Sequence, residues 1–423
     1  MTYKKTVFAN GTKIITESLS HSKSVSLGIW VNAGSRDELD KDRGIFHLIE
    51  HMTFKGTKSR SAIQIAKDLD TIGGFSNAFV GKEQTCFHAR VLIKHLQFLA
   101  DLLSDIFINS IFAERDLELE KAVVLQEISM TEDTPDEYVH VLFDQTFWGE
   151  DPLGKPILGT KETVSSINRR GILDYVSRFY SPQRVIIAAA GSVDHDLLVD
   201  YFRTFFEALP DHDNGSPARP TPLTTPTVSS YPKELEQVHL CLGAQASSLS
   251  EDRRFAEAIF NTILGGNMSS RLFQEIREKR GLAYSVYSHI SGYRDTGLAR
   301  IYVATDKEEI NRVLELIELL IKGIQNGDLS ASDIARAKEY LIGGILLGSE
   351  NADNLMVQLA KNEFIFERYI HHKELIAELK KVTLDEVIEA SQRIFSGGNV
   401  SLTVLGPVDR DKIGVDTLNF KVS

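Results

Sequence analysis

Three residues, His47, Glu50 and His51, form the pattern H-x-x-E-H within the segment GIFHLIEHMTF. In a helix, residues four apart lie one turn apart on the same face, so both imidazoles can bind one ion with Glu50 beside them. Such a pair suits Zn²⁺, and the carboxylate can take a proton from water and give it to a leaving amine. The pattern indicates metal-assisted hydrolysis; the alternative is a helix whose histidines are surface or hydrogen-bonded core residues.

A site with two histidines needs a third protein ligand if one position is to stay open for water. The later helical run ERDLELEKAVVLQEISM supplies candidates. Glu120 and Glu127 are seven residues apart, so they lie close together on a helical wheel, beside Leu117, Val124 and Ile128. A carboxylate at the border of a buried face is costly unless it meets a cation. The alternative is an ordinary charged helix edge in water.

These residues must be positioned by a chain of 423 residues, which is too long for one ordinary domain. The segment Ala208–Lys233 contains six prolines and many hydroxyl residues without an apolar period, which is typical of a linker. We therefore expect an N-terminal catalytic zinc-binding domain at 1–210, a linker at 211–232 and a C-terminal domain at 233–423.

The two halves resemble each other in sequence pattern. VSLGIWVNAGS (Val25–Ser35) and VHLCLGAQASS (Val238–Ser248) both read as an apolar strand followed by polar residues and a helix. SRFYSPQRVIIAAAGSVD and SQRIFSGGNVSLTVLGPVD repeat another shared plan at an offset of about 213–215 residues. Helices cluster between antiparallel-type hairpins, which predicts an α+β fold of two duplicated, homologous halves.

Composition and charge limit the classes of function that the protein can have. Hydrophobic residues make up 42% and charged residues 25% of the chain, as in soluble globular proteins. Cys86 and Cys241 are the only cysteines and lie in different halves, which argues against a disulfide framework or a cysteine zinc site. The net charge of −12 disfavours nucleic acid as a partner and could attract basic peptides. The start of the chain has no apolar signal region, and no membrane span is expected, so a cytoplasmic location is predicted.

The motif and its context resemble the pitrilysin-type inverzincin peptidases, over nearly the whole chain. In that family the third ligand is a glutamate 76 residues after the second histidine, which is Glu127 here. A supporting acid lies seven residues earlier, at Glu120. The branch of the mitochondrial processing peptidase β subunit and its bacterial relatives is the most similar, through FKGT, IGGFSNAFVGKEQT, DPLGKPILGT and LGGNMSSRLFQEIREKRGLAYSV.

The resemblance also implies how substrate is held. Phe75–Val80 looks like the family's edge strand, to which an extended peptide adds by main-chain pairing. Arg277 and Tyr284 match a pair that reaches the substrate near the scissile carbonyl, where Tyr284 could hydrogen-bond the oxyanion. The alternatives are an ordinary strand after a Gly-Gly turn, a solvated helix arginine and a packed strand tyrosine. The implied substrate-binding residues are Phe75, Ser76, Asn77, Ala78 and Phe79.

The second half cannot repeat the metal site. The 213-residue offset maps His47, Glu50 and His51 onto Phe260, Ile263 and Leu264, which are apolar. One Zn²⁺ per chain is therefore expected. The resemblance implies that the second half closes over the substrate, so that the two halves enclose a chamber.

The function predicted from these observations is that of a zinc metalloendopeptidase. Glu50 acts as general base, and the substrates are unfolded peptides or presequence-like segments, possibly basic ones. The alternative is a non-catalytic or partner-dependent subunit of a processing-peptidase-like complex. A homodimer is the default expected for this branch.

Overall fold

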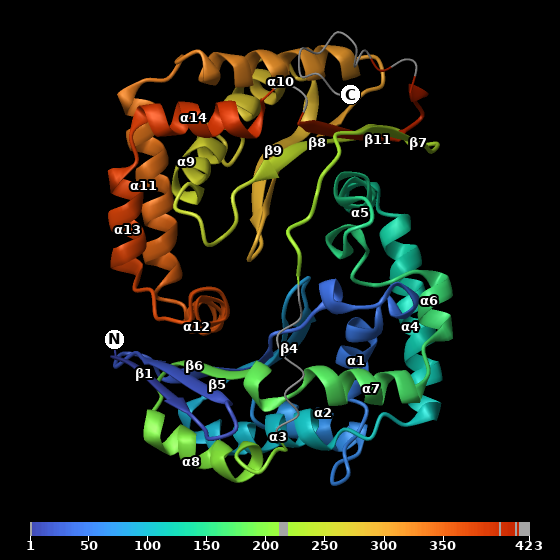
Figure 1. Cartoon of the computed structure of the whole chain (residues 1–423), viewed down its shortest axis with the longest axis vertical. Helices are drawn as coiled ribbons and strands as arrows, with labels where there is room; N and C mark the ends of the chain where they lie inside the picture. The colour runs from blue at the N-terminus through green and yellow to red at the C-terminus, as the bar shows by residue number, and fades with distance from the viewer. Residues whose placement is uncertain (1, 211–218, 397–398, 411–412, 414–423) are drawn as a thin grey trace. The chain divides into compact units, whose positions relative to one another are not determined.

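The computed structural model describes residues 2–210, 219–396, 399–410 and 413. Residues 211–218 of the predicted linker lie outside the described residues. The chain forms two compact units, each built on one sheet, so the predicted α+β fold is confirmed (Figure 1). The segments of unit 1 are Met1–Met130, Lys155–Ala218 and Leu347–Tyr369; those of unit 2 are Thr131–Gly154, Arg219–Leu346 and Ile370–Ser423.

The sheet of unit 1 has six strands in the order β1-β2-β6-β3-β5-β4. The β2–β6 pair is parallel and the other pairs are antiparallel. β4 forms one edge and pairs with β5 alone. The strands are β1 (Thr2–Val7), β2 (Lys13–Ser18), β3 (Ser24–Val31), β4 (Phe75–Val80), β5 (Thr85–Leu92) and β6 (Val185–Gly191).

Both faces of this sheet are covered, which explains why β3 and β6 are apolar at nearly every position. Leu27 and Ile29 point into a core shared with α1, α3, α7 and α8. Trp30, on the opposite face, packs against α12 and donates a 3.1 Å hydrogen bond to the Met356 sulfur. The helices of this unit are α1 (Ile45–Thr53), α2 (Ala62–Thr71), α3 (Leu96–Asn109), α4 (Glu114–Glu132, entering unit 2 after Met130), α6 (Lys161–Ser166), α7 (Arg169–Phe179), α8 (His195–Phe206) and α12 (Ala352–Phe366).

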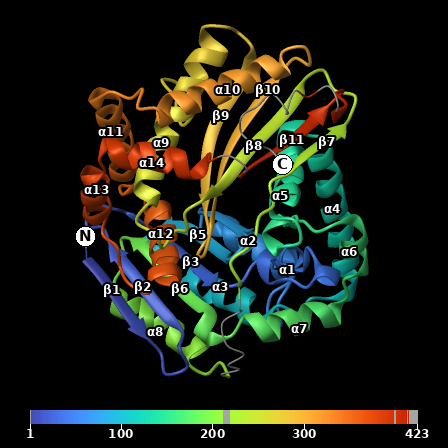
Figure 2. The same cartoon turned by 45° about the horizontal axis from the view of Figure 1, so that its top comes forward.

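Unit 2 contains a five-stranded sheet in the order β7-β11-β8-β10-β9 (Figure 2). One face packs on α9, α10, α11 and α14, and the other packs on α5. The strands are β7 (Val228–Pro232), β8 (Val238–Ala246), β9 (Ala283–Gly292), β10 (Gly297–Thr305) and β11 (Val400–Gly406). The helices are α5 (Pro135–Trp148), α9 (Arg254–Leu264), a π-helix (Phe273–Glu278), α10 (Ile310–Gln325), α11 (Ala331–Gly348), α13 (His372–Lys381) and α14 (Leu384–Ile394).

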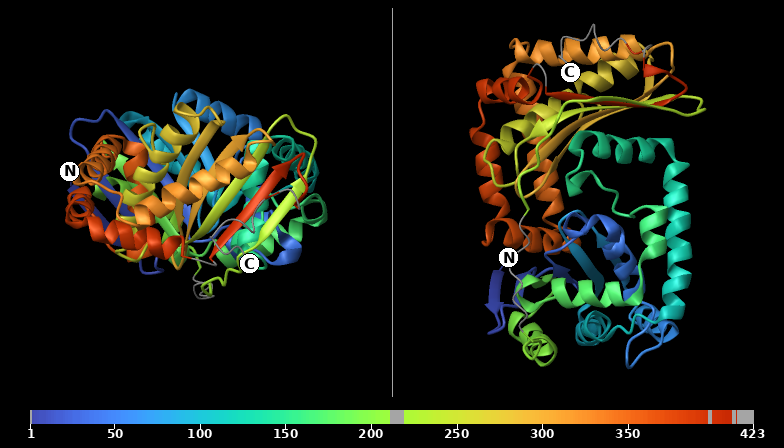
Figure 3. Two further views of the ribbon diagram at one scale, coloured as in Figure 1. Left: turned by 90° about the horizontal axis from the view of Figure 1, so that it is seen from above. Right: turned by 45° about the vertical axis from the view of Figure 1, so that its right-hand side comes forward.

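The two sheets share one topology, which supports the predicted duplication. The order β2-β6-β3-β5-β4 corresponds to β7-β11-β8-β10-β9, with the same parallel and antiparallel pairs. α5 and α12 begin 217 residues apart, at Pro135 and Ala352, and are equivalent in this repeat. Each serves the sheet built from the other half of the sequence: α5 packs on β8 and β11, and α12 packs on β2, β3 and β6 (Figure 3).

Within the part of the chain that the structure describes, no helix is both long enough and apolar enough to span a bilayer.

Candidate metal centre

The first part of the candidate site is α1, whose sequence separates an apolar face from a polar one. Ile45, Leu48, Ile49 and Met52 are fully buried in the core of unit 1. His47, Glu50 and His51 lie on the opposite side and are half-buried, with the two imidazole centroids 4.6 Å apart. The predicted helix and its shared face are therefore present.

A buried carboxyl group caps the beginning of α1. Glu38 is 4% exposed and accepts hydrogen bonds from the backbone N–H groups of Gly44 at 3.0 Å and Phe46 at 2.9 Å. Burial raises the pKa of Glu38 to about 8, while these two donors and Arg43 oppose the shift. The first turn of a helix has unpaired N–H groups, so Glu38 fixes where α1 starts and hence where its histidines lie.

The second part of the site is α4, which brings a carboxylate to the two imidazoles. The Glu127 Oε2 atom lies 3.7 Å from the Nε2 atoms of both His47 and His51. One ligand atom from each of the three residues lies within 4.8 Å of the other two. Two imidazole nitrogens and one carboxylate oxygen are a usual donor set for Zn²⁺ in hydrolases, so these residues fit the predicted ion.

Hydrogen bonds around the histidines suit metal binding. His51 Nδ1 lies 3.1 Å from Glu120 Oε2, and Lys55 Nζ lies 2.6 Å from Glu120 Oε1. The series of contacts from Lys55 through Glu120 to His51 holds the His51 ring so that Nε2 faces Glu127. Burial, followed by the charge of His51, lowers the pKa of His47 to about 4, which keeps its imidazole neutral and able to ligate at neutral pH. Glu120 thus contacts His51 and Lys55, and its role as a supporting acid stays a prediction.

The Lys55–Glu120 pair gives a first prediction. Lys55→Met removes the ammonium that orients Glu120, so we expect zinc affinity to fall by about tenfold, within the range seen for outer-shell substitutions. Lys55→Arg should restore most of that affinity. Zinc affinity is measured by competition with a coloured chelator, and Lys58→Met, which changes a nearby exposed lysine, is the matched control. Equal affinities in all four proteins would contradict the role given to Lys55.

Glu50 lies next to the histidines in a partly desolvated environment. Burial raises the pKa of Glu50, and the charge of His51 opposes this shift. The backbone of Val80, at the end of β4, also opposes the rise in the pKa of Glu50. A carboxylate with a raised pKa is a better proton acceptor near neutral pH than an ordinary glutamate.

The predicted substrate strand is β4, and it lies at the edge of its sheet. Phe75 is 85% exposed, and Ser76 and Asn77 are exposed as well, while Ala78 and Phe79 are half-buried. β4 also lies against α1, so the edge strand and the candidate base Glu50 belong to one local structure.

Arg277 and Tyr284 belong to unit 2, and the structure brings these two residues together. The Arg277 guanidinium lies 4.8 Å from the ring centre of Phe273 and 4.7 Å from that of Tyr284. Phe273 and Arg277 both belong to the π-helix, and Tyr284 is 77% exposed on β9. Phe273 was not anticipated from the sequence, because an aromatic residue on a helix is usually read as core.

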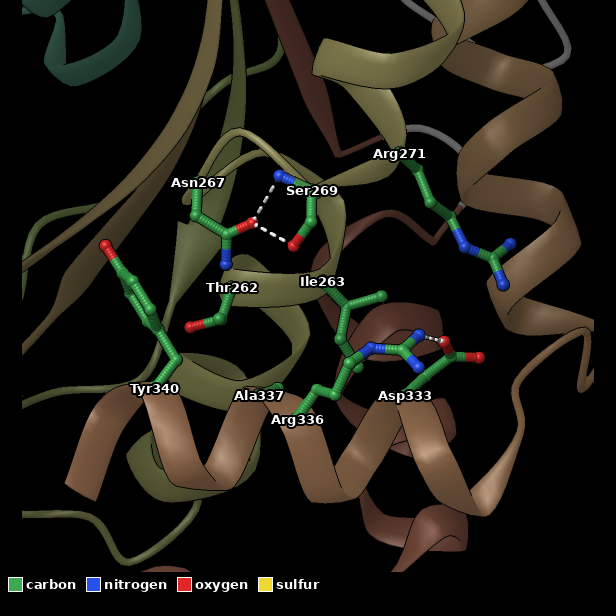
Figure 4. A pocket seen from close by; sticks show the side chains of 9 residues that line it. All are labelled: Thr262, Ile263, Asn267, Ser269, Arg271, Asp333, Arg336, Ala337 and Tyr340. Carbon is green, nitrogen blue, oxygen red and sulfur yellow. Dashed lines mark hydrogen bonds and ion pairs between the residues drawn. The ribbon is translucent and has the colours of Figure 1, made fainter. Parts of the chain in front are cut away.

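A separate pocket of unit 2, with a volume of about 190 Å³, contains none of the predicted site residues (Figure 4). Its two arginines already have partners, since Arg336 pairs with Asp333 and Arg271 pairs with Asp328. It adds nothing to the metal centre. The lining residues are Thr262, Ile263, Asn267, Ser269, Arg271, Asp333, Arg336, Ala337 and Tyr340.

The positions of unit 2 that are equivalent to His47, Glu50 and His51 are buried core residues. Phe260, Ile263 and Leu264 are at most 9% exposed and pack in the main core of that unit. Among the described residues, His47, His51 and Glu127 are the only group found that could hold a metal ion.

Comparison with known proteins agrees with this division. Residues 13–161 match the profile of the insulinase family, peptidase family M16, and residues 166–341 match that of the peptidase M16 inactive domain. The chain belongs to peptidase family M16.

Two relatives are similar to the chain over almost its whole length. An uncharacterized zinc protease of Streptomyces coelicolor, SCO5738, is 38% identical and aligns over 97% of this chain and 91% of its own. The uncharacterized zinc protease YmxG of Bacillus subtilis is 37% identical over 96% of this chain and 98% of its own. The predicted family is thus confirmed.

Solved structures share the fold at low sequence identity. A protease from Helicobacter pylori has a TM-score of 0.89 at 18% identity, covering 96% of this chain and 99% of its own. A peptidase M16 inactive domain from Pseudomonas fluorescens has a TM-score of 0.90 at 19% identity, covering 97% and 98%.

Proposed function

We propose that the protein is a zinc-dependent endopeptidase that hydrolyses unfolded peptides, including presequence-like segments. The observation that carries this proposal is the meeting of His47, His51 and Glu127 ligand atoms within 4.8 Å, next to the half-buried Glu50. Membership of peptidase family M16, and the zinc proteases among the relatives, support it.

In the proposed reaction His47, His51 and Glu127 hold the ion. Zinc, when bound, supplies a Lewis acid that makes water more acidic and polarises a carbonyl. Glu50 accepts the proton of the attacking water and later delivers it to the departing amine. Its position beside the ligand histidines and its raised pKa suit both transfers.

Two further groups are proposed to handle the substrate. β4 offers main-chain groups at an open sheet edge, which suits an extended peptide. Tyr284 is assigned to the oxyanion and Arg277 to its orientation, supported by the exposure of Tyr284 and the contact between the two side chains. Both assignments require the substrate to meet unit 2.

The test is cleavage of a peptide library by the purified full-length chain, read by mass spectrometry. We expect internal bonds to be cleaved, cleavage to stop when a strong zinc chelator is added, and zinc to restore it. Cleavage that continues in chelator would contradict a metal mechanism. A lone chain that holds zinc and cleaves no peptide would instead favour a partner-dependent or non-catalytic subunit.

Two parts of the sequence-based prediction stay predictions. The homodimer is tested by size exclusion with light scattering, and the cytoplasmic location by fractionation of cells that carry the tagged chain. A preference for basic peptides would appear in the library products as positive residues near the cleaved bonds.

A further inference from the structure

Within unit 2, a cluster of polar side chains lies between α5 and the face of the sheet that this helix covers. His140 of α5 is at the centre of the cluster. Its Nδ1 atom lies 2.9 Å from the Arg300 guanidinium and 3.5 Å from the Cys241 sulfur. Its Nε2 atom lies 2.9 Å from the Tyr287 hydroxyl oxygen. One imidazole thus connects α5 to β8, β9 and β10.

These contacts determine which nitrogen of His140 carries the ring proton. A guanidinium has donors only, so Nδ1 must accept a hydrogen bond from Arg300 and is not protonated. Burial raises the pKa of Cys241 to about 12, so its S–H group is a second donor toward Nδ1. The single proton of the neutral ring therefore lies on Nε2 and is donated to Tyr287. A second proton would have to bind Nδ1, where it would point at a positive charge.

The cation that faces Nδ1 is held in place by α5 itself. Arg300 forms an ion pair with Asp144, which lies one turn after His140 on the same helix. Its guanidinium also lies 4.9 Å from the ring centre of Phe143. Asp144 is already paired with Arg300, so it cannot neutralise a charged His140 without giving up that pair.

The helix lies close against the sheet at this point. Gly243 of β8 is the register partner of Arg300, and a Cβ atom at Gly243 would lie 2.8 Å from the Phe143 ring. The missing side chain lets the ring lie directly on the strand. Val139 and Phe147 are buried in the same contact. The docked position of α5 is therefore well defined, and it places a neutral His140 against Arg300.

The charges around His140 oppose its protonation. Burial, followed by the charge of Arg300, lowers the pKa of His140 to about 4, while Asp136 opposes the shift. β11 and the 3₁₀ turn Pro152–Gly154 also contact α5 and contain no titratable side chain. The titratable and charged groups around the ring are Asp136 and Asp144 of α5, His239 and Cys241 of β8, Tyr287 and His289 of β9, and Arg300 and Tyr302 of β10.

We infer that the docking of α5 on the sheet of unit 2 is a pH-sensitive switch, in which α5 is docked while His140 is neutral and is released when His140 binds a second ring proton. The inference goes beyond the proposed function and does not depend on it. Only Asp133 and Thr134 separate α5 from α4, which carries Glu120 and Glu127. Acid release of α5 thus frees the segment that directly follows the helix of the candidate metal centre.

The direction of the pH effect follows from the two states of the helix. The pKa of His140 is about 4 when α5 is docked and returns toward the ordinary value of about 6.5 when α5 is released. The docked state is therefore fully favoured above pH 6.5 and loses this advantage as the pH falls toward 4. Between pH 7.5 and pH 5, the ratio of released to docked helix should rise about 25-fold.

Hydrogen exchange of the full-length chain, read by mass spectrometry, measures this ratio. After correction for the intrinsic effect of pH on exchange, peptides from α5 should lose about 25-fold in protection between pH 7.5 and pH 5. His140→Asn keeps an oxygen near the position of Nδ1 and cannot be protonated, so its loss should stay below about threefold. His21→Asn makes the same change at an exposed histidine of unit 1 and should behave like the parent.

The helix α10 of the same unit is the internal reference. An equal loss of protection in α10 would show that unit 2 opens as a whole, and it would overturn the switch. Unchanged protection of α5 in the parent, or an equal loss in His140→Asn, would overturn it as well. Should His140→Asn fail to dock α5 at pH 7.5, His140→Gln, whose amide reaches toward Tyr287, replaces it in the same comparison.

Discussion

Glu50→Gln is expected to lower kcat by about 10²–10⁴-fold, the usual contribution of a positioned general base, while the protein keeps one zinc per chain. Glutamine has nearly the same shape as glutamate, but it cannot take up a proton from water. The measurement combines steady-state peptide cleavage with metal content by atomic absorption.

The matched control for this variant is Glu118→Gln, which changes an exposed carboxylate on α4 away from the ligand atoms. It should behave like the parent protein. Near-normal turnover by Glu50→Gln would refute the assignment of Glu50. Loss of zinc together with turnover would mean that Glu50 acts on the site through structure and not as a base.

Removal of one proposed zinc ligand is the second change for which a large effect is expected. His51→Ala and Glu127→Gln are each expected to weaken zinc binding by more than about 100-fold, which exceeds the largest usual outer-shell effect, because the ion loses one of three protein ligands. Zinc affinity is measured by chelator competition, and hydrolysis is measured at fixed low zinc. Excess zinc should rescue Glu127→Gln in part, since glutamine retains a carbonyl oxygen.

His21→Ala serves as the control for these variants, because His21 is exposed and lies outside the metal cluster. Glu127→Gln with unchanged zinc affinity would remove the link between α4 and the histidines on which the site depends. In that case the 3.7 Å approaches of Glu127 to both imidazoles would have no functional meaning.

Spacing made the cluster of His47, His51 and Glu127 predictable from the sequence. Helical periodicity places His47 and His51 on one face, and the family's fixed interval points to Glu127. The structure then brings their ligand atoms within 4.8 Å. The absence of a second metal site in the other half could also be predicted from the sequence, because Phe260 and Leu264 occupy the positions of the two histidines. Local periodicity can predict which residues share a helix face, because a helix face depends on nearby residues alone.

Other site residues depend on contacts that no local pattern encodes. Glu38 caps α1 from an irregular segment, and its two hydrogen bonds follow from the path of the loop. Lys55 acts through Glu120, 65 residues later in the chain. β4 lies against α1, which carries Glu50, only in the folded unit. Each requires the tertiary fold to be known.

The boundaries of the compact units could likewise not be predicted from the sequence. The predicted linker separates the halves in chain order, and nothing in the apolar periods of α5 or α12 tells which sheet each helix will cover. Their places follow from the packing of residues such as Phe143 against β8 and Met356 against β3.

The placement of α5 and α12 makes each half of the polypeptide incomplete without the other. A fragment ending at residue 210 would contain every strand of the first sheet yet leave Trp30, Ile186 and Ala188 bare, since the cover for that face is encoded beyond residue 350. The later fragment would leave Cys241, Leu298 and Tyr302 bare for the same reason. The two halves, produced as separate fragments, should therefore not fold independently. Each should expose apolar surface and aggregate, and the two should become soluble only when they reassemble as a pair.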